Sequence, residues 1–297
     1  MHPEALIYFT SDHSLGSPGI YPYGLCIAVG IILCFGFLFY TMWKKKFNEA
    51  SSDTILLIGI FATAFGFLVA ALFQATYNYI ENPAAGFDLG SGITFIGGLI
   101  GGVAGFLGVY FLYMYVVRPR TKIKFLTKPM NATLTDALPF IPIGICIAHA
   151  FGRLGCFFGG CCYGMETDAW YGIACAGGPE KVIPTQLFEM IFLLVLAAVM
   201  AFLYFKYRFN YNFSVYLIAY GIWRFLIEYL RDDARGSFIG SVTPSQFWSI
   251  IMIPLGVGYI FLQMYVLSKQ MKHPELEGAE KAATEPDPQP EPPAEEA

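Results

Sequence analysis

The run GLCIAVGIILCFGFLFYTMW, residues 24–43, contains twenty consecutive residues without a charged side chain. An α-helix rises about 1.5 Å per residue, so this run is long enough to cross the roughly 30 Å hydrocarbon core of a bilayer. Similar runs recur along most of the chain. The sequence therefore predicts an all-α polytopic membrane protein with about seven transmembrane helices, at residues 24–43, 54–77, 93–117, 135–151, 186–205, 213–230 and 244–267.

Composition supports this class and excludes others. Of the 297 residues, 56% are hydrophobic and only 13% are charged, whereas soluble domains carry about 25% charged residues. The net charge of −4 and the lack of a basic stripe exclude a nucleic-acid binder. We expect three regions: an external segment at 1–22, a membrane domain at 23–270 and a disordered acidic tail at 271–297. The tail is proline-rich, and residues 273–297 hold eight acids and one base.

The positions of lysine and arginine predict the orientation. If the N-terminus lies outside, 13 of the 18 basic residues are cytoplasmic, as the positive-inside rule requires. The acidic tail is then cytoplasmic, and the segment between the fourth and fifth spans faces outward. Residues 1–22 lack the basic region of a cleavable signal peptide, so we expect the first span to serve as an uncleaved signal anchor.

The segment HAFGRLGCFFGGCCYG, residues 149–164, places Arg153 at membrane depth, where a cation is costly and usually faces a cavity or a partner. Gly152 and Gly155 flank Arg153, so the local backbone can bend and come close to a ligand. A guanidinium beside backbone donors suits a phosphate or a carboxylate. The alternative is an arginine that extends to the outer membrane interface.

Three cysteines of this segment, Cys156, Cys161 and Cys162, are separated by four residues and then by none. Adjacent cysteines are hard to place as two tetrahedral ligands, so we expect no metal and no other cofactor. Small packing residues are the favoured interpretation. A disulfide, for example with Cys175, is the alternative.

Two further groups of charged residues lie in predicted spans or directly after them. Arg224, Glu228 and Arg231 are spaced i, i+4 and i+7, which places them on one helix face. An anionic headgroup would complete such a face, although a self-contained Arg224–Glu228 pair is the alternative. Glu189 lies about one turn inside the fifth span, where an unpaired carboxylate is costly.

Glycine spacing in the third predicted span allows two interpretations. Gly97, Gly101 and Gly105 are four residues apart, which lets helices approach closely. Alternatively, the bare backbone at Gly97 and Gly98 contacts a lipid headgroup.

Three segments together resemble the phosphatidylglycerol–prolipoprotein diacylglyceryl transferase family: GRLGCFFGGCCYG at 152–164, PTQLFE at 184–189 and YGIWRFLIEYLR at 220–231. The resemblance covers most of residues 20–265. It implies a seven-span transferase of the bacterial cytoplasmic (inner) membrane with its active site toward the outer leaflet. Such an enzyme moves the diacylglyceryl group of phosphatidylglycerol onto the lipobox cysteine of a prolipoprotein and releases glycerol 1-phosphate. Its partners are therefore phosphatidylglycerol, other membrane lipids and prolipoprotein signal peptides.

The resemblance also implies roles for individual residues. Arg153 matches the essential signature arginine of the family, Arg224 and Glu228 match its arginine–glutamate pair, and Tyr23 matches its first-span tyrosine. The expected catalytic residues are His149, Arg153, Arg224 and Glu228. The expected headgroup-binding residues are Tyr23, Gly97, Gly98, Arg153, Gly155, Arg224 and Arg231.

The chain departs from the family's pattern at the usual base. Ile96 stands where its best-studied members have histidine. His149 precedes Arg153 by four residues and shares its helix face, so we hypothesise that His149 replaces this base, with Glu189 or Glu228 as the next candidates. A histidine that only packs is the alternative. The departures also leave open an enzyme of the same fold with another acceptor, or a non-catalytic lipid or anion carrier.

Overall fold

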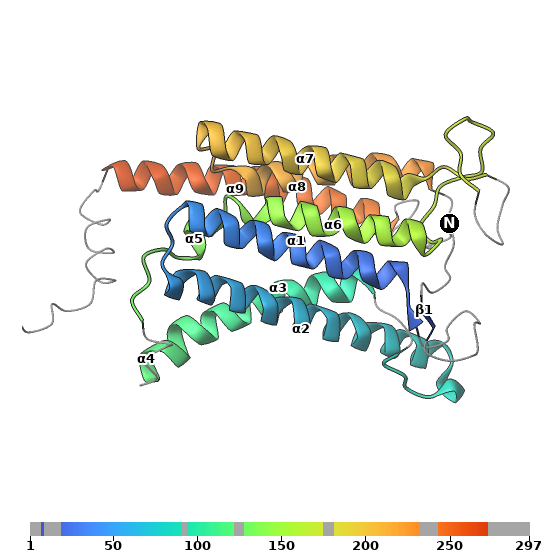
Figure 1. Cartoon of the computed structure of the whole chain (residues 1–297), viewed down its shortest axis with the longest axis horizontal. Coiled ribbons are helices and arrows are strands. Elements are labelled where there is room, and N and C mark those ends of the chain that lie inside the picture. Colours follow the sequence, from blue (N-terminus) through green and yellow to red (C-terminus); the bar gives the residue numbers. More distant parts are fainter. Residues whose placement is uncertain are drawn as a thin grey trace, which may run out of the picture. The chain divides into compact units, whose positions relative to one another are not determined.

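The computed structural model describes residues 7–8, 19–90, 94–121, 128–174, 181–231 and 243–272, which are mostly helical (Figure 1). The elements are β1 Ile7–Tyr8, β2 Gly19–Ile20, α1 Pro22–Lys44, α2 Glu49–Glu81, the 3-10 turn η1 Pro83–Ala85, α3 Phe95–Phe111, the π-helical turn η2 Leu112–Val117, α4 Arg118–Arg120, α5 Leu134–Ala137, α6 Ile141–Phe158, α7 Thr185–Tyr207, α8 Asn212–Ile227, the 3-10 turn η3 Glu228–Leu230 and α9 Pro244–Lys272. Strands β1 and β2 pair in antiparallel fashion, with Ile7 opposite Ile20.

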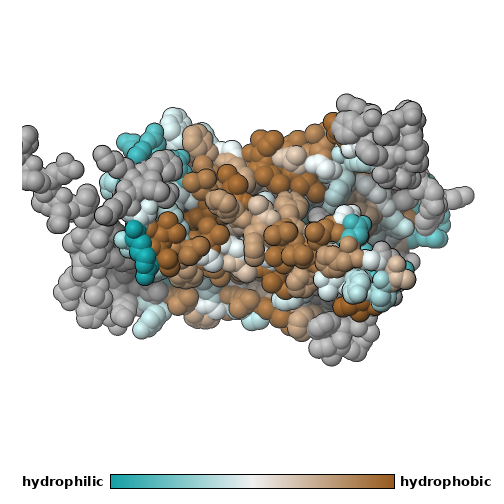
Figure 2. Space-filling model, turned by 90° about the horizontal axis from the view of Figure 1, so that it is seen from below, coloured by the Kyte–Doolittle hydropathy of each residue, from teal (hydrophilic) through white to brown (hydrophobic). Residues whose placement is uncertain are grey.

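Seven of the described helical segments are long and apolar enough to cross a membrane, which confirms the predicted fold class. They are Pro22–Lys44, Glu49–Ile80, Ile100–Arg120, Ile141–Phe158, Thr185–Tyr207, Asn212–Leu230 and Ser245–Tyr265. Figure 2 shows apolar residues across the middle of one face, with hydrophilic residues toward its two ends. Large apolar side chains such as Ile32 and Phe61 are exposed, as expected where lipid rather than water is the solvent. The chain is therefore an integral membrane protein.

The chain divides into two compact units. Of the residues that the structure describes, those up to Thr41 and those from Thr135 onward form one unit, and those from Met42 to Leu134 form the other. In the first unit, α6 packs against α7 and α8 packs against α9. Helix α1 lies beside α6, where a Cβ atom on Gly30 would come within 2.7 Å of Phe151 Cβ (Figure 1). The predicted tail at 271–297 falls almost wholly outside the described residues, so the three-region division and the orientation stay predictions.

The second unit is built on the packing of α2 against α3, and glycines make that packing possible. A Cβ atom at Gly97 would lie 2.9 Å from Ala70 Cα, one at Gly101 would lie 2.5 Å from Val69 Cβ, and one at Gly105 would lie 2.8 Å from a ring carbon of Phe65. The interpretation of this spacing as close helix packing is confirmed.

The fourth span begins later than predicted. The short helix α5 ends at Ala137, and α6 starts at Ile141, with Pro142 in its first turn. Proline suits the first turn, where its missing N–H would have no helical partner. Helix α6 then continues unbroken through Arg153 to Phe158, so Gly152 and Gly155 lie within regular helix.

Candidate active site

A buried ion pair joins α6 to α7 at the centre of the candidate site. The Nε atom of Arg153 lies 3.1 Å from Oε2 of Glu189. The Arg153 side chain is 12% exposed and that of Glu189 is fully buried. Glu189 is therefore the counterion of Arg153, and the two costs that the sequence suggested separately, a buried cation and a buried carboxylate, offset each other.

A third helix contributes to the same carboxylate. The hydroxyl of Tyr220 in α8 donates a hydrogen bond of 2.8 Å to Oε1 of Glu189. The Nε2 atom of His149 lies 3.4 Å from the same hydroxyl and 3.8 Å from Oε1 of Glu189. The structure thus brings His149, Arg153 and Glu189 together. Sequence reasoning missed Tyr220, although its position four residues before Arg224 places it on the charged face of α8.

A second buried ion pair lies where α8 passes into η3. Arg224 Nη2 is 3.0 Å from Glu228 Oε2, and both side chains are almost completely buried. Ser245 accepts a 2.7 Å hydrogen bond from Arg224, and Thr243 donates one of 2.9 Å to Glu228. Sequence reasoning also missed these two hydroxyls, which flank the start of α9 and carry no charge to signal them.

The two ion pairs form one electrostatic site. The positive charges of Arg153 and Arg224 both act on Glu189. Among the described residues, Nη1 of Arg224 is buried and has no hydrogen-bond partner. A buried guanidinium donor without a partner is suited to an anionic ligand oxygen.

Arg231 does not extend the face formed by Arg224 and Glu228, contrary to expectation. The α-helix ends at Ile227, η3 tightens the chain over the next turn, and Arg231 is extended (φ −101°, ψ 145°). Its backbone pairs with Gly164, and its side chain hydrogen-bonds to Cys162. The i+7 relation therefore fails because the helix stops before it reaches Arg231.

The start of α7 holds the turn that carries two cysteines. Thr185 Oγ1 donates a 2.8 Å hydrogen bond to the carbonyl of Cys162, and Gln186 Nε2 donates one of 2.6 Å to the carbonyl of Cys161. Both donor side chains belong to residues that are fully buried. In the PTQLFE segment, Thr185 and Gln186 thus position the turn, and Glu189 positions Arg153.

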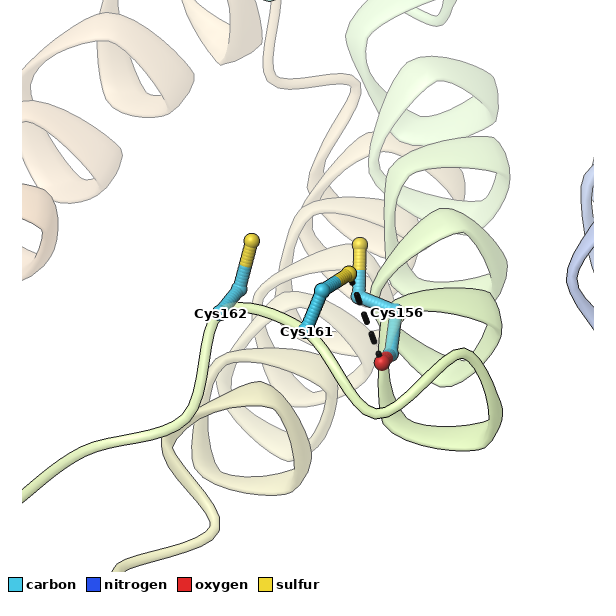
Figure 3. Close-up of side chains that lie close together, drawn as sticks. All are labelled: Cys156, Cys161 and Cys162. Atoms are coloured by element: carbon cyan, nitrogen blue, oxygen red, sulfur yellow. Dashed lines mark hydrogen bonds between the residues drawn. The ribbon is translucent and has the colours of Figure 1, made fainter. Parts of the chain in front are cut away.

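This turn gathers three thiols. The Sγ atoms of Cys156, Cys161 and Cys162 all lie within 4.8 Å of one another, and in Figure 3 the three sulfurs project to the same side of the turn. Cys162 adopts a left-handed backbone (φ 64°) two residues after Gly160 (φ 65°), and the expectation that these cysteines bind no metal stays a prediction. None of the cysteines in the described part of the chain forms a disulfide, and Cys175 lies outside that part.

The neighbouring groups make the thiols of the turn unequal. The neighbouring thiols of Cys156 and Cys161, together with the charge of Arg231, hold the pKa of Cys162 well below that of an ordinary thiol. The neighbouring thiols of Cys156 and Cys162 raise the pKa of Cys161, whose own thiol donates a 3.7 Å hydrogen bond to the carbonyl of Cys156. Cys162 is therefore the first of these two thiols to become a thiolate.

Comparison with known proteins agrees with the geometry. A family model described as prolipoprotein diacylglyceryl transferase matches residues 13–262. This chain belongs to that family. Curated phosphatidylglycerol–prolipoprotein diacylglyceryl transferases resemble it over most of their length: one from Clostridium tetani is 30% identical over 80% of this chain and 91% of the relative. One from Finegoldia magna is 33% identical over 79% of this chain and 88% of the relative. A second-numbered transferase of this name from Clostridium perfringens is 30% identical over 80% of this chain and 89% of the relative.

The remaining residues expected from the resemblance to prolipoprotein diacylglyceryl transferases fall into two groups. Tyr23 lies against Gly155: a Cβ atom added at Gly155 would be 3.1 Å from the carbonyl oxygen of Tyr23. The charge of Arg153 also acts on the Tyr23 side chain. These three residues are brought together. Gly97 and Gly98 belong to the other compact unit, so their expected place beside the headgroup stays a prediction.

Proposed function

We propose that this integral membrane protein transfers the diacylglyceryl group of phosphatidylglycerol to the lipobox cysteine of prolipoproteins and releases glycerol 1-phosphate. We place it in the bacterial cytoplasmic membrane, with the N-terminus outside and the site open to the outer leaflet. Family membership supports the reaction, and the distribution of lysine and arginine supports the orientation.

The observation that carries the proposal is the pair of buried arginines, Arg153 and Arg224, whose positive charges both act on Glu189. In the proposed reaction, the acceptor sulfur attacks the glyceryl carbon of phosphatidylglycerol. The bond from that carbon to the phosphate oxygen breaks, and the oxygen leaves with the bonding pair. Negative charge therefore grows on the phosphate, where two cations fixed in a low-dielectric site stabilise it.

The acceptor thiol must lose a proton before its sulfur attacks. Glu189 and Glu228 are each committed to an arginine. His149 is not within hydrogen-bonding distance of a carboxylate oxygen, and its side chain is 18% exposed. We therefore propose that His149 accepts this proton. In this role His149 takes the place of the histidine that the family usually has at the position of Ile96.

The test is a transfer assay in vesicles that contain phosphatidylglycerol. The purified protein receives a synthetic lipobox peptide, and mass spectrometry follows the gain of one diacylglyceryl group. Arg153→Gln and His149→Gln should each reduce the rate by at least about a hundredfold, as expected for loss of electrostatic stabilisation or of a general base. Arg120→Gln is the matched control, because Arg120 is exposed and hydrogen-bonds only to the carbonyls of Tyr115 and Val116 among the described groups.

Two further controls define the substrates. Vesicles of zwitterionic lipid alone, and a peptide with serine in place of the lipobox cysteine, should give no product. If folded wild-type protein transfers nothing to the cysteine peptide, the proposal is wrong, and another acceptor or a carrier function replaces it. Equal transfer rates for His149→Gln and wild type would contradict only the role of His149 as the base and would leave the proposed reaction standing.

A further inference from the structure

The thiols of Cys156, Cys161 and Cys162, called here the thiol cluster, lie close enough together to share one metal ion. Thiolates bind zinc at about 2.3 Å, so sulfurs that share one tetrahedral ion lie about 3.8 Å apart. The three Sγ atoms already lie within 4.8 Å of one another. Side-chain movements of about 1 Å or less would close the cluster on an ion.

The backbone beneath the thiol cluster is held in place from a different helix. The hydrogen bonds from Thr185 and Gln186 fix the carbonyls of Cys161 and Cys162, and Cys162 keeps a left-handed backbone that a non-glycine residue rarely adopts. Such outer contacts, which orient the ligands, are a regular part of metal sites. Strain of this kind concentrates where function requires a defined geometry.

We propose that the thiol cluster binds a zinc ion through its three sulfurs, and that the fourth coordination position takes the cysteine thiol of the acceptor. The second half of this inference rests on the proposed function. Sulfur ligands select thiophilic ions such as zinc, and a zinc site with three protein ligands leaves one position open for a substrate. Cys161 is exposed, so the open position is accessible to a peptide.

The location of the thiol cluster fits this role. His149, Arg153 and Cys156 are spaced i, i+4 and i+7 along the unbroken helix α6, so they share one face. Cys156 is about 4.5 Å further along the helix axis than Arg153, and the two side chains interact electrostatically. A thiol held on the ion would thus lie beside the arginine that we assign to the phosphate.

The proposed step balances as follows. The acceptor thiol coordinates zinc as a thiolate, and its proton passes through solvent to His149, which lies about 10 Å from Cys156 along the helix axis. The sulfur then forms a bond to the glyceryl carbon while the bond from that carbon to the phosphate oxygen breaks, and glycerol 1-phosphate leaves with the electron pair. His149 returns its proton to the released phosphate. The thioether that results has no negative charge and is a weak ligand, so the product leaves the ion and the site is ready for another acceptor.

Metal binding is tested first, on the full chain purified in detergent with its thiols reduced and its metal removed. Zinc alone is titrated against a chromophoric chelator, and cobalt is used to count sulfur ligands from its charge-transfer and ligand-field absorption. We expect one ion per chain and a three-sulfur spectrum. Cys161→Ser should weaken binding by more than the roughly 10- to 100-fold that loss of an outer contact costs. Since Cys161 is exposed, this variant should fold, and Cys34→Ser, a cysteine outside the cluster, should bind as wild type does.

Acceptor binding is tested on the cobalt-loaded protein. A lipobox peptide should convert the spectrum to that of four sulfur ligands, and a peptide with serine in place of cysteine should leave it unchanged. The inference is overturned if no ion binds, if Cys161→Ser binds as tightly as wild type, or if the cysteine peptide does not alter the spectrum. A disulfide within the thiol cluster of the active protein, seen as a loss of two hydrogen masses without bound metal, also overturns it.

The two proposals fail separately. Transfer activity that survives chelation and Cys161→Ser would leave the proposed function standing and remove the zinc site. Stoichiometric zinc binding, with a peptide-dependent cobalt spectrum but no transfer to the peptide, would leave the zinc site standing and remove the proposed reaction.

Discussion

Replacing Glu189 with glutamine isolates the charge of the central carboxylate. The amide has almost the same shape, and its oxygen can still accept the hydrogen bond from Tyr220. Arg153, however, loses the anion that lies 3.1 Å from its Nε atom. The charge of Arg224 also acts on this position, so the substitution removes one negative charge from a site that holds two buried arginines.

The expected loss of stability is large because the pair is buried. Removing one partner of a buried ion pair costs about 3–5 kcal/mol, since the other charge is left without compensation. This corresponds to an increase in the unfolded population by a factor of roughly one hundred to several thousand. Glu49→Gln provides the matched control: Glu49 lies 3.3 Å from Lys128, but its side chain is 83% exposed. Exposed pairs contribute about 0–1 kcal/mol, so this variant should resemble wild type.

The assay is equilibrium unfolding in mixed micelles with an increasing fraction of denaturing detergent, followed by circular dichroism. The double variant Arg153→Gln, Glu189→Gln should lose less stability than the sum of the two single variants, by about 0.5–3 kcal/mol, because it leaves neither charge unpaired. A stability of Glu189→Gln within about 0.5 kcal/mol of wild type, or strict additivity in the double variant, would refute the buried ion pair.

Three other variants test separate contacts. Gly164→Ala should reduce stability by about 1–3 kcal/mol in the same unfolding assay, since the new methyl group would collide with the backbone carbonyl of Leu230; unchanged stability would contradict that close approach. Tyr220→Phe removes the hydrogen bond to Glu189 and should cost about 1.5–3 kcal/mol, while a loss below about 0.5 kcal/mol would mean that the carboxylate does not depend on it. Asn48→Ala removes the side-chain cap of α2 and should cost about 0.5–2 kcal/mol, with Asn48→Ser, which retains a capping oxygen, expected to recover most of the loss.

The predicted fold followed from the apolar runs alone, because crossing hydrocarbon imposes a length and a composition that a sequence displays directly. The fourth span shows the limit of that inference. Its apolar window began at residue 135, yet the helix begins at Ile141. A hydropathy window does not detect the effect of Pro139 and Pro142 on where a helix can begin. Proline has that effect because it has no backbone N–H and restricts the conformation of the residue before it.

Within one helix, the side-chain relations could also be predicted from spacing. Arg224 and Glu228 do pair, and His149 and Arg153 do share a face of α6. Arg231 was predicted wrongly by the same rule, because the rule assumes that the helix continues through it. Periodicity is thus informative only as far as the helix extends.

The sequence by itself predicted the seven helices that, in the described part of the chain, are long and apolar enough to cross a membrane, and it resembled the family to which the chain belongs. Only the tertiary structure decided which charges meet. Glu189 was an isolated buried carboxylate until the packing of α6 against α7 set it beside Arg153. The thiol cluster likewise depends on hydrogen bonds from α7 and on a left-handed residue in the turn. Contacts between elements depend on how each is rotated and placed against the next, and a linear spacing rule carries no information about that placement.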